Sequence, residues 1–195
     1  EDSSLEEGVE MVTAPISLEI FKKEIIPIVK KLQKKGYTSE QGGRCGNHIH
    51  ISRNAFSEEA QARLILIYAR FESIIKILSR RNGNFSYCKD VLTTATAVSL
   101  DNATEVVQNQ KAKGKSTAIN FNNSNTIEFR TFRGTMNTDV LIANIQLIQL
   151  IADLALTEMS IQDILNLTFS GLIQKMQEDG YQELLQYCDK KGLLD

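Results

Sequence analysis

The clearest alternation of polar and apolar residues runs from Gly46 to Ser52, where His48 and His50 are interleaved with two isoleucines. Successive side chains of a strand point to opposite faces, so this pattern predicts a strand with both histidines on one face. By the same rule, residues 126–133 (Thr-Ile-Glu-Phe-Arg-Thr-Phe-Arg) predict a second strand with Glu128 and Arg130 on one face. A sheet surface of histidine, carboxylate and arginine suits metal and phosphate chemistry.

Two further segments have the pattern of strands. Residues 8–13 predict a short strand with Glu10 and Val12 on one face, ended by an Ala-Pro pair. Residues 116–121 predict a strand that forms a hairpin with residues 126–133 across the sequence Asn-Asn-Ser-Asn. Asparagine tolerates the left-handed backbone geometry that such turns need.

Helical periodicity covers much of the remaining chain. Apolar residues recur every three or four positions over residues 17–35, with Pro27 as an expected kink and Gly36 as the expected end. Similar patterns predict helices over 57–79 and 138–156 and two shorter helices near 160–178 and 180–190, whereas the polar, lysine-rich segment 108–115 predicts a mobile loop. The order of these elements indicates an α+β fold without internal repeats.

Composition narrows the function classes. The net charge of −2 and the pI near 5.8 argue against general nucleic-acid binding. Three widely spaced cysteines without a Cys-x-x-Cys pair fit a reducing compartment, so we expect a cytoplasmic protein. No apolar run reaches membrane-spanning length and no charged-then-apolar leader opens the chain, so no membrane association is expected. The chain begins at Glu1 within motif-like sequence, and we expect native sequence upstream of it.

The candidate chemistry lies on the two alternating strands. These strands use both histidines of the chain, and imidazole serves both as a metal ligand and as an acid–base group. Glu128 lies between two apolar residues of a strand, where a carboxylate needs a partner or a cation; an internal salt bridge with Arg130 is the alternative. The pair Arg80-Arg81 follows a helix, where arginines usually complement the helix dipole. The phosphate loop and the Gly-x-Ser-x-Gly elbow are absent from the sequence.

Four segments, in this order, resemble the amidoligase families of the glutamine synthetase-like carboxylate–amine ligases. The segments are residues 2–15 (Asp-Ser-Ser-Leu, then Gly-Val-Glu and Thr-Ala-Pro), 45–50 (Cys-Gly-Asn-His-Ile-His), 80–89 (Arg-Arg, then Tyr-Cys-Lys) and 116–135 (Ser-Thr-Ala-Ile-Asn, then Thr-Ile-Glu-Phe-Arg and Gly-Thr). Each segment alone is a weak signal, but the four in order are fairly specific.

The resemblance implies a glutamine synthetase-like catalytic domain, in which a curved antiparallel sheet is backed by helices and the active site lies on the concave face. This domain would cover residues 1–159, and residues 160–195 would be a helical extension packed on it. Members of this group usually begin with a strand that carries two alternating glutamates. No such strand is present in residues 1–195, so this N-terminal strand would lie upstream or be lost.

The resemblance also implies the reaction: ATP activates a carboxylate as an acyl phosphate, and an amine attacks it to form an amide or peptide-like bond. The cofactors would be ATP and Mg²⁺, or Mn²⁺, and the substrates a small-molecule or peptide carboxylate and an amine. By resemblance, Glu10, His48 and Glu128 would bind the metal, with Asp2 as a weaker candidate. His50 would lie beside the nucleotide phosphates, and Arg130 would face the substrate carboxylate or the transferred phosphate. The expected phosphate-neutralising residues are Arg81 and Lys89, with Arg80 and Arg133 as further candidates.

Two other functions fit the same residues. A His-x-His pair with a carboxylate can hold zinc and a water nucleophile, as in a metal-dependent hydrolase. A non-enzymatic binding protein with a degenerate site would account for the missing glutamate strand. The arginine cluster favours the ligase, since a hydrolytic zinc site needs fewer phosphate-binding cations.

Overall fold

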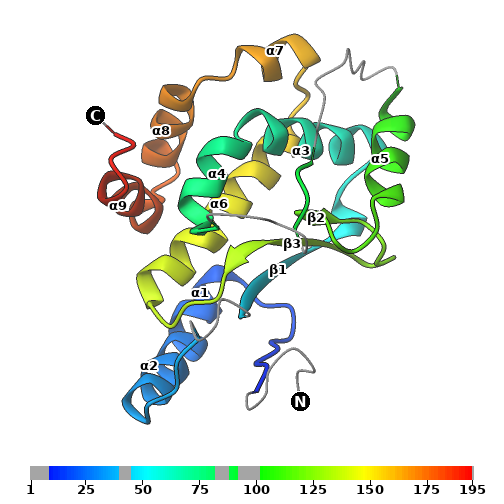
Figure 1. Cartoon of the computed structure of the whole chain (residues 1–195). Helices are drawn as coiled ribbons and strands as arrows, with labels where there is room; N and C mark the ends of the chain where they lie inside the picture. Colours follow the sequence, from blue (N-terminus) through cyan, green and yellow to red (C-terminus); the bar gives the residue numbers. More distant parts are fainter. Residues whose placement is uncertain (1–8, 40–44, 82–87, 92–101, 195) are drawn as a thin grey trace.

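The computed structural model describes residues 9–39, 45–81, 88–91 and 102–194, and Figure 1 shows its arrangement. Within these residues a three-stranded antiparallel sheet is formed by β1 (Gly46–Ser52), β3 (Thr126–Arg133) and the short β2 (Ile119–Asn120), in the order β1-β3-β2. The helical elements are α1 (Leu18–Ile20), the π-helical η1 (Phe21–Ile25), α2 (Ile26–Lys34), the 3-10 turn η3 (Arg53–Ala55), α3 (Glu58–Arg70), α4 (Glu72–Ser79), α5 (Ala103–Ala112), α6 (Thr138–Leu156), α7 (Ile161–Asn166), α8 (Phe169–Glu178) and α9 (Gln182–Lys190). The α+β class predicted from the sequence is confirmed.

The sheet has one apolar and one polar face. The apolar face packs on the helices through Ile119, Ile127 and Phe129, which are fully buried, and the Phe129 ring lies 6.2 Å from that of Tyr68 in α3. Along β1, the residues Gly46, His48, His50 and Ser52 are exposed, and the residues between them are partly buried. We call the face that carries His48, His50 and Glu128 the outer face. The predicted two-faced alternation of β1 is confirmed.

A β-bulge interrupts the pairing of β1 with β3. Asn47 pairs with Phe132 and Ile49 with Phe129, so Arg130 and Thr131 of β3 both lie opposite His48. An extra residue in one strand reverses the faces of all the residues beyond it. Phe132 therefore returns to the core, where it is fully buried, although strict alternation from Phe129 would place it on the outer face.

Local sequence signals set the main helix boundaries. The Ser57 hydroxyl accepts from the amide of Ala60 and begins α3; the predicted helix over 57–79 is interrupted only at Phe71 and continues as α4. Asn137 caps α6, whose bounds match the prediction. Pro27 cannot donate a backbone hydrogen bond, and the π-helical turn η1 comes just before it. Gly36, at φ +86°, follows the end of α2 as expected.

Three predicted elements need correction. Residues 9–14 form exposed coil rather than a strand, because no strand in the described structure pairs with them. Residues 108–115 are not a mobile loop: most of them belong to α5, which buries Val106, Val107 and Gln110. The Gln110 amide donates to the Thr117 hydroxyl and the Ile119 carbonyl, which fixes α5 beside β2. The strand predicted over 116–121 is confined to Ile119–Asn120.

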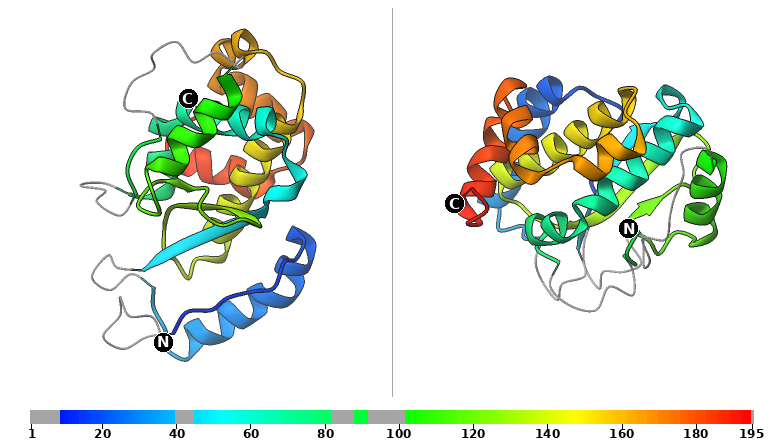
Figure 2. Two further views of the ribbon diagram at one scale, coloured as in Figure 1. Left: turned by 90° about the vertical axis from the view of Figure 1, so that its right-hand side faces the viewer. Right: turned by 90° about the horizontal axis from the view of Figure 1, so that it is seen from above.

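The C-terminal region is helical, as predicted, and packs on the body of the protein. The helix expected over 160–178 is divided into α7 and α8, because Thr168 begins a new helix by accepting from the amide of Gly171. Helix α9 packs along α6, and α7 contacts α3 (Figures 1 and 2). By length and composition α6 could cross a membrane, contrary to the expectation that no apolar run reaches that length, but most of it is buried in the core.

Candidate active site

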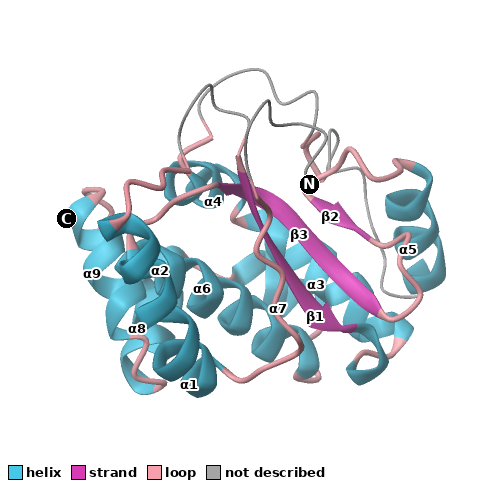
Figure 3. Cartoon of the chain, turned by 90° about the horizontal axis from the view of Figure 1, so that it is seen from below, coloured by secondary structure: helices cyan, strands magenta, loops and turns pink. Residues whose placement is uncertain are grey.

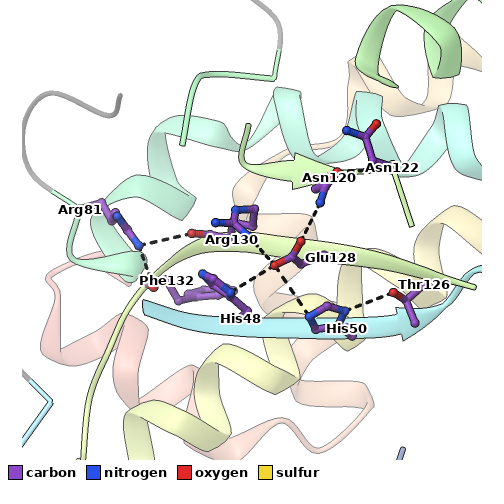
Figure 4. A network of polar contacts seen from close by, with 9 residues as sticks. All are labelled: His48, His50, Arg81, Asn120, Asn122, Thr126, Glu128, Arg130 and Phe132. Carbon is purple, nitrogen blue, oxygen red and sulfur yellow. Dashed lines mark hydrogen bonds and ion pairs between the residues drawn. The ribbon is translucent and has the colours of Figure 1, made fainter. Parts of the chain in front are cut away.

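Strand β1 presents both histidines to a single carboxylate on β3. His48 Nδ1 lies 3.2 Å from Glu128 Oε1, and His50 Nε2 lies 3.8 Å from the same oxygen (Figure 4). The His48 and His50 side chains are 33% and 47% exposed, so a ligand can reach the two rings from solvent. The predicted juxtaposition of His48 and Glu128 is therefore present, although the two residues are far apart in the sequence.

Glu128 is held by every strand of the sheet. Arg130 Nη1 donates to Oε1 at 2.6 Å, and Asn120 Nδ2 donates to Oε2 at 2.7 Å. In the strand register, Asn120, Glu128 and His50 form one row across β2, β3 and β1. The carboxylate is thus fixed from three sides, and the salt bridge with Arg130 that the sequence left open is present.

These contacts keep Glu128 ionised although it is buried. Burial raises the pKa of this carboxyl, but hydrogen bonds from His48 and Asn120 and the charge of Arg130 outweigh that effect and lower the pKa to about 2. A carboxylate that accepts several hydrogen bonds strongly favours its charged form. The outer face therefore carries a fixed negative charge between positive or protonatable groups.

Asn120 is the site residue that the sequence analysis did not assign. It lies in the segment 116–135 that resembles the amidoligase families, but the resemblance implied no role for it. Its Oδ1 accepts from the amide of Asn122, which holds the side chain toward Glu128 at the start of the turn. The sequence does contain a signal for this role. Ile119 and Asn120 alternate just before the turn, which places the Asn120 side-chain amide on the same face of the sheet as Glu128. At the other end of this row, His50 Nδ1 lies 3.2 Å from the hydroxyl oxygen of Thr126, which holds the ring in place.

Arg80 and Arg81, for which the resemblance implies phosphate neutralisation, contact backbone carbonyls in β3 and just after it. Arg81 Nε donates to the Thr131 carbonyl at 3.0 Å, and its Nη2 lies 3.3 Å from the Phe132 carbonyl and 3.5 Å from that of Arg130. Arg80 Nη2 donates to the carbonyls of Arg133 and Gly134 at 3.1 and 2.9 Å. Much of the hydrogen-bonding capacity of both guanidinium groups is therefore used by the protein itself.

The remaining predicted residues lie at four separate places in the chain. Arg133 is partly buried and lies opposite Gly46 at the start of β1. Lys89 is exposed beside β2, where its backbone bridges to Thr117. Glu10 lies in exposed coil, and Asp2 lies outside the described residues.

Metal binding by the expected set is not supported by this arrangement. In the described part of the chain, no group of three or more histidine, cysteine, aspartate or glutamate side chains is placed to hold a metal ion. The structure brings His48 and Glu128 together but does not bring Glu10 into such a group. In nucleotide sites Mg²⁺ commonly takes one or two protein carboxylates and completes its shell with phosphate oxygens and water. Glu128 fits a cation only in that limited way, as a single carboxylate ligand.

Gly46 makes room for the site. A Cβ atom at this position would lie 2.9 Å from His48 Nε2 and 3.6 Å from Arg81 Nη2. Real Cβ atoms do not approach ring nitrogens this closely, so any side chain at position 46 would displace the imidazole. The glycine of the Gly-Asn-His segment is therefore part of the geometry of the outer face.

Comparison with known families gives a match across most of the chain. Residues 1–152 match the family model described as "Putative amidoligase enzyme". The chain belongs to this amidoligase family. The match includes the three strands of the sheet and most of α6 and ends before α7. Searches among curated proteins and among solved structures found no match. The amidoligase family indicates an enzyme of the ligase type, in agreement with the resemblance seen in the four motifs.

Proposed function

We propose that the protein is an ATP-dependent carboxylate–amine ligase that forms an amide or peptide-like bond through an acyl phosphate on the outer face of the sheet. The observation that carries the proposal is the network of Glu128 with His48, Arg130 and Asn120, found in a chain of the amidoligase family. Fixed charges and oriented donors are the main requirement of phosphoryl transfer, in which positioning and charge stabilisation supply most of the catalysis.

Four residues of the outer face have roles in this proposal, namely Arg130, Glu128, Asn120 and His50. Arg130 faces the phosphoryl or carboxylate oxygens of the substrate. The Arg130 side chain is 24% exposed, so part of its guanidinium group can be reached from solvent. Glu128 fixes the Arg130 guanidinium, and Asn120 fixes Glu128. His50 is the second candidate for contact with the phosphates.

ATP is the proposed energy source, with a divalent cation that arrives on its phosphates. Such a cation would neutralise phosphate charge, and Glu128 would be its protein carboxylate. The proposed substrates are a small or peptide carboxylic acid and an amine. A water-poor site would protect the acyl phosphate from hydrolysis until the amine attacks.

A catalytically degenerate binding protein is the second candidate. It is favoured by the same finding that limits metal binding, namely that the described residues offer a single carboxylate at the site. The hydrolase alternative gains less support, because a catalytic zinc needs three protein ligands and the described residues offer no group of three or more histidine, cysteine, aspartate or glutamate side chains placed to hold a metal.

Calorimetric titration with MgATP tests the proposal. Arg130→Ala should weaken binding by about tenfold or more, since a charge-assisted hydrogen bond contributes about 1.5–3 kcal/mol. Arg70→Ala is the matched control, because Arg70 is exposed at the end of α3, where it contacts the Phe71 ring. Equal effects of the two substitutions, or binding that needs no divalent cation, would count against the ligase.

A further inference from the structure

The bulge in β3 decides which arginines reach the outer face. Ile127 and Phe129 are separated by two positions and Phe129 and Phe132 by three, yet all three side chains are fully buried. With strict alternation, Arg133 would point toward the core and Phe132 toward solvent. The extra residue therefore places Arg133 on the same face as Glu128 and Arg130.

Such a bulge needs support, because it leaves backbone groups outside the regular ladder. Arg81 supplies this support. Its guanidinium lies within hydrogen-bonding distance of three consecutive carbonyls, those of Arg130, Thr131 and Phe132. Figure 4 shows Arg81 beside this part of β3, separate from the contacts around Glu128. A planar fork of donors matches this cluster of acceptors, whereas a lysine ammonium would not.

Arg81 reaches the bulge through an unfavourable backbone conformation at Arg80. Arg80 ends α4 with φ 58°, and it is the one non-glycine residue in the described structure with a positive φ. Left-handed backbone geometry is unfavourable for a residue that carries a Cβ. The resulting turn lets two successive arginines reach β3, Arg80 at its end and Arg81 at the bulge. Strain of this kind is often found where the backbone serves a site.

Arg81 also lies among other cations. Burial lowers the pKa of Arg81, and the charges of Arg130 and Arg133 lower it further. The hydrogen bonds to the bulge carbonyls oppose this repulsion and keep three guanidinium groups near one another. The carbonyls thus allow a concentration of positive charge beside His48.

We infer that Arg81 is a positioning residue: by binding the carbonyls of the bulge, it fixes the register in which Arg130 and Arg133 both face the site. This assignment replaces the direct phosphate contact that the sequence implied for Arg81. The effect on ligand binding rests on the proposed function, whereas the effect on β3 does not.

The first experiment tests, in the absence of any ligand, whether Arg81 holds the bulge. The chain has two histidines, so its NMR spectrum contains two histidine Hε1 signals, one from each ring, which report on His48 and His50 of β1. At fixed pH, Arg81→Lys should move the His48 signal and the amide signals of Arg130 to Phe132, and leave the His50 signal near its original position. Arg70→Lys is the control and should move none of them. Arg81→Lys keeps the charge, which limits the risk of unfolding, and circular dichroism checks its fold.

The second experiment is a double-mutant cycle read by MgATP affinity. In the native background, Arg133→Ala should weaken MgATP binding about tenfold. In the Arg81→Lys background the same change should weaken binding less than about twofold, because the Arg133 side chain no longer faces the site in that background. Equal costs in both backgrounds would mean that Arg81 does not position Arg133, and the inference would fail.

The two experiments separate the two claims. If the native protein does not bind MgATP, the proposed function fails and the NMR spectra alone decide the role of Arg81. If Arg81→Lys leaves the amide signals of the bulge and the His48 signal unchanged, Arg81 does not hold the bulge, whatever the affinity for ATP.

Discussion

At the level of single residues, the site depends on one buried carboxylate, that of Glu128, and on Gly46, which leaves space for the His48 ring. The sequence predicted the shared face of His48 and His50 and that of Glu128 and Arg130, because alternation in a strand is a local rule, and it left open the salt bridge between Glu128 and Arg130. It did not predict the role of Asn120, since that role depends on which residue of β2 lies beside Glu128. Cross-strand neighbours depend on register, and a single sequence carries little information about register.

The low pKa of Glu128 predicts an acid-sensitive contribution to stability. Its pKa is lowered from 4.5 to about 2 in the folded state, so the contribution is complete above about pH 4.5 and is lost as the pH falls toward 2. The difference in unfolding free energy between native protein and Glu128→Gln should shrink over this range, by on the order of 2–3 kcal/mol. Urea unfolding at several pH values measures it. A difference that stays constant with pH would contradict the network drawn around Glu128.

Gly46→Ala is expected to disturb the site more than the fold. The new methyl group would meet His48 Nε2 at 2.9 Å and force the imidazole to turn away from Glu128. The His48 ring signal should shift and MgATP affinity should fall, while the unfolding temperature changes little because position 46 is exposed. Ser52→Ala, at the exposed far end of β1, provides the control. An unchanged His48 signal would show that the ring does not occupy the place described.

At the level of elements, the sequence predicted the helices that carry regular apolar stripes and missed features created by contacts between elements. Helix α6 was predicted with its bounds, and α3 with its start. The sequence predicts a loop over the end of α5, because the buried positions there include Gln110, a polar residue whose partners are Thr117 and Ile119. The spacing of Ile127, Phe129 and Phe132 signalled the bulge, but an apolar residue three positions on is also compatible with a strand end.

Gln110→Ala tests the contact between α5 and β2. The buried amide donates to two acceptors, so its removal should lower the free energy of unfolding by about 1–3 kcal/mol. Gln108→Ala is a closely matched control, because Gln108 belongs to the same helix and is exposed. Chemical denaturation compares the two. If both substitutions have the same small effect, α5 is not fixed to β2 in this way.

At the level of the whole molecule, the sheet and its helices form the body. The N-terminal helical segment contacts this body through α2, which buries Ile26 and Val29 and touches α6, and through an ion pair with α9. The left view of Figure 2 shows the N-terminal helical segment below the sheet, and Figure 3 shows the outer face from below. Lys22 Nζ lies 2.6 Å from Glu183 Oε1 in α9, and Gln146 of α6 donates to the other oxygen of Glu183. The sequence predicted this helix but could not predict where it docks, because docking depends on two residues 161 positions apart.

Lys22→Met should loosen the N-terminal segment without unfolding the body. Hydrogen exchange of residues 18–34 should become faster, and exchange in α3 and α6 should stay as it was. Lys23→Met is the control, since the Lys23 side chain is 79% exposed. Mass-spectrometric exchange resolves the segments. Faster exchange throughout the protein, or an unchanged exchange rate in residues 18–34, would contradict the attachment through Glu183.

The central claim is that the outer face performs ATP-dependent ligation. The most direct measurement is ADP release by the full-length protein, assayed with panels of carboxylates and amines. The account predicts ADP release only when both a carboxylate and an amine are present, and its loss in Glu128→Gln and His48→Ala variants that remain folded. Release that persists in both variants, or hydrolysis of an ester or amide without ATP, would contradict it.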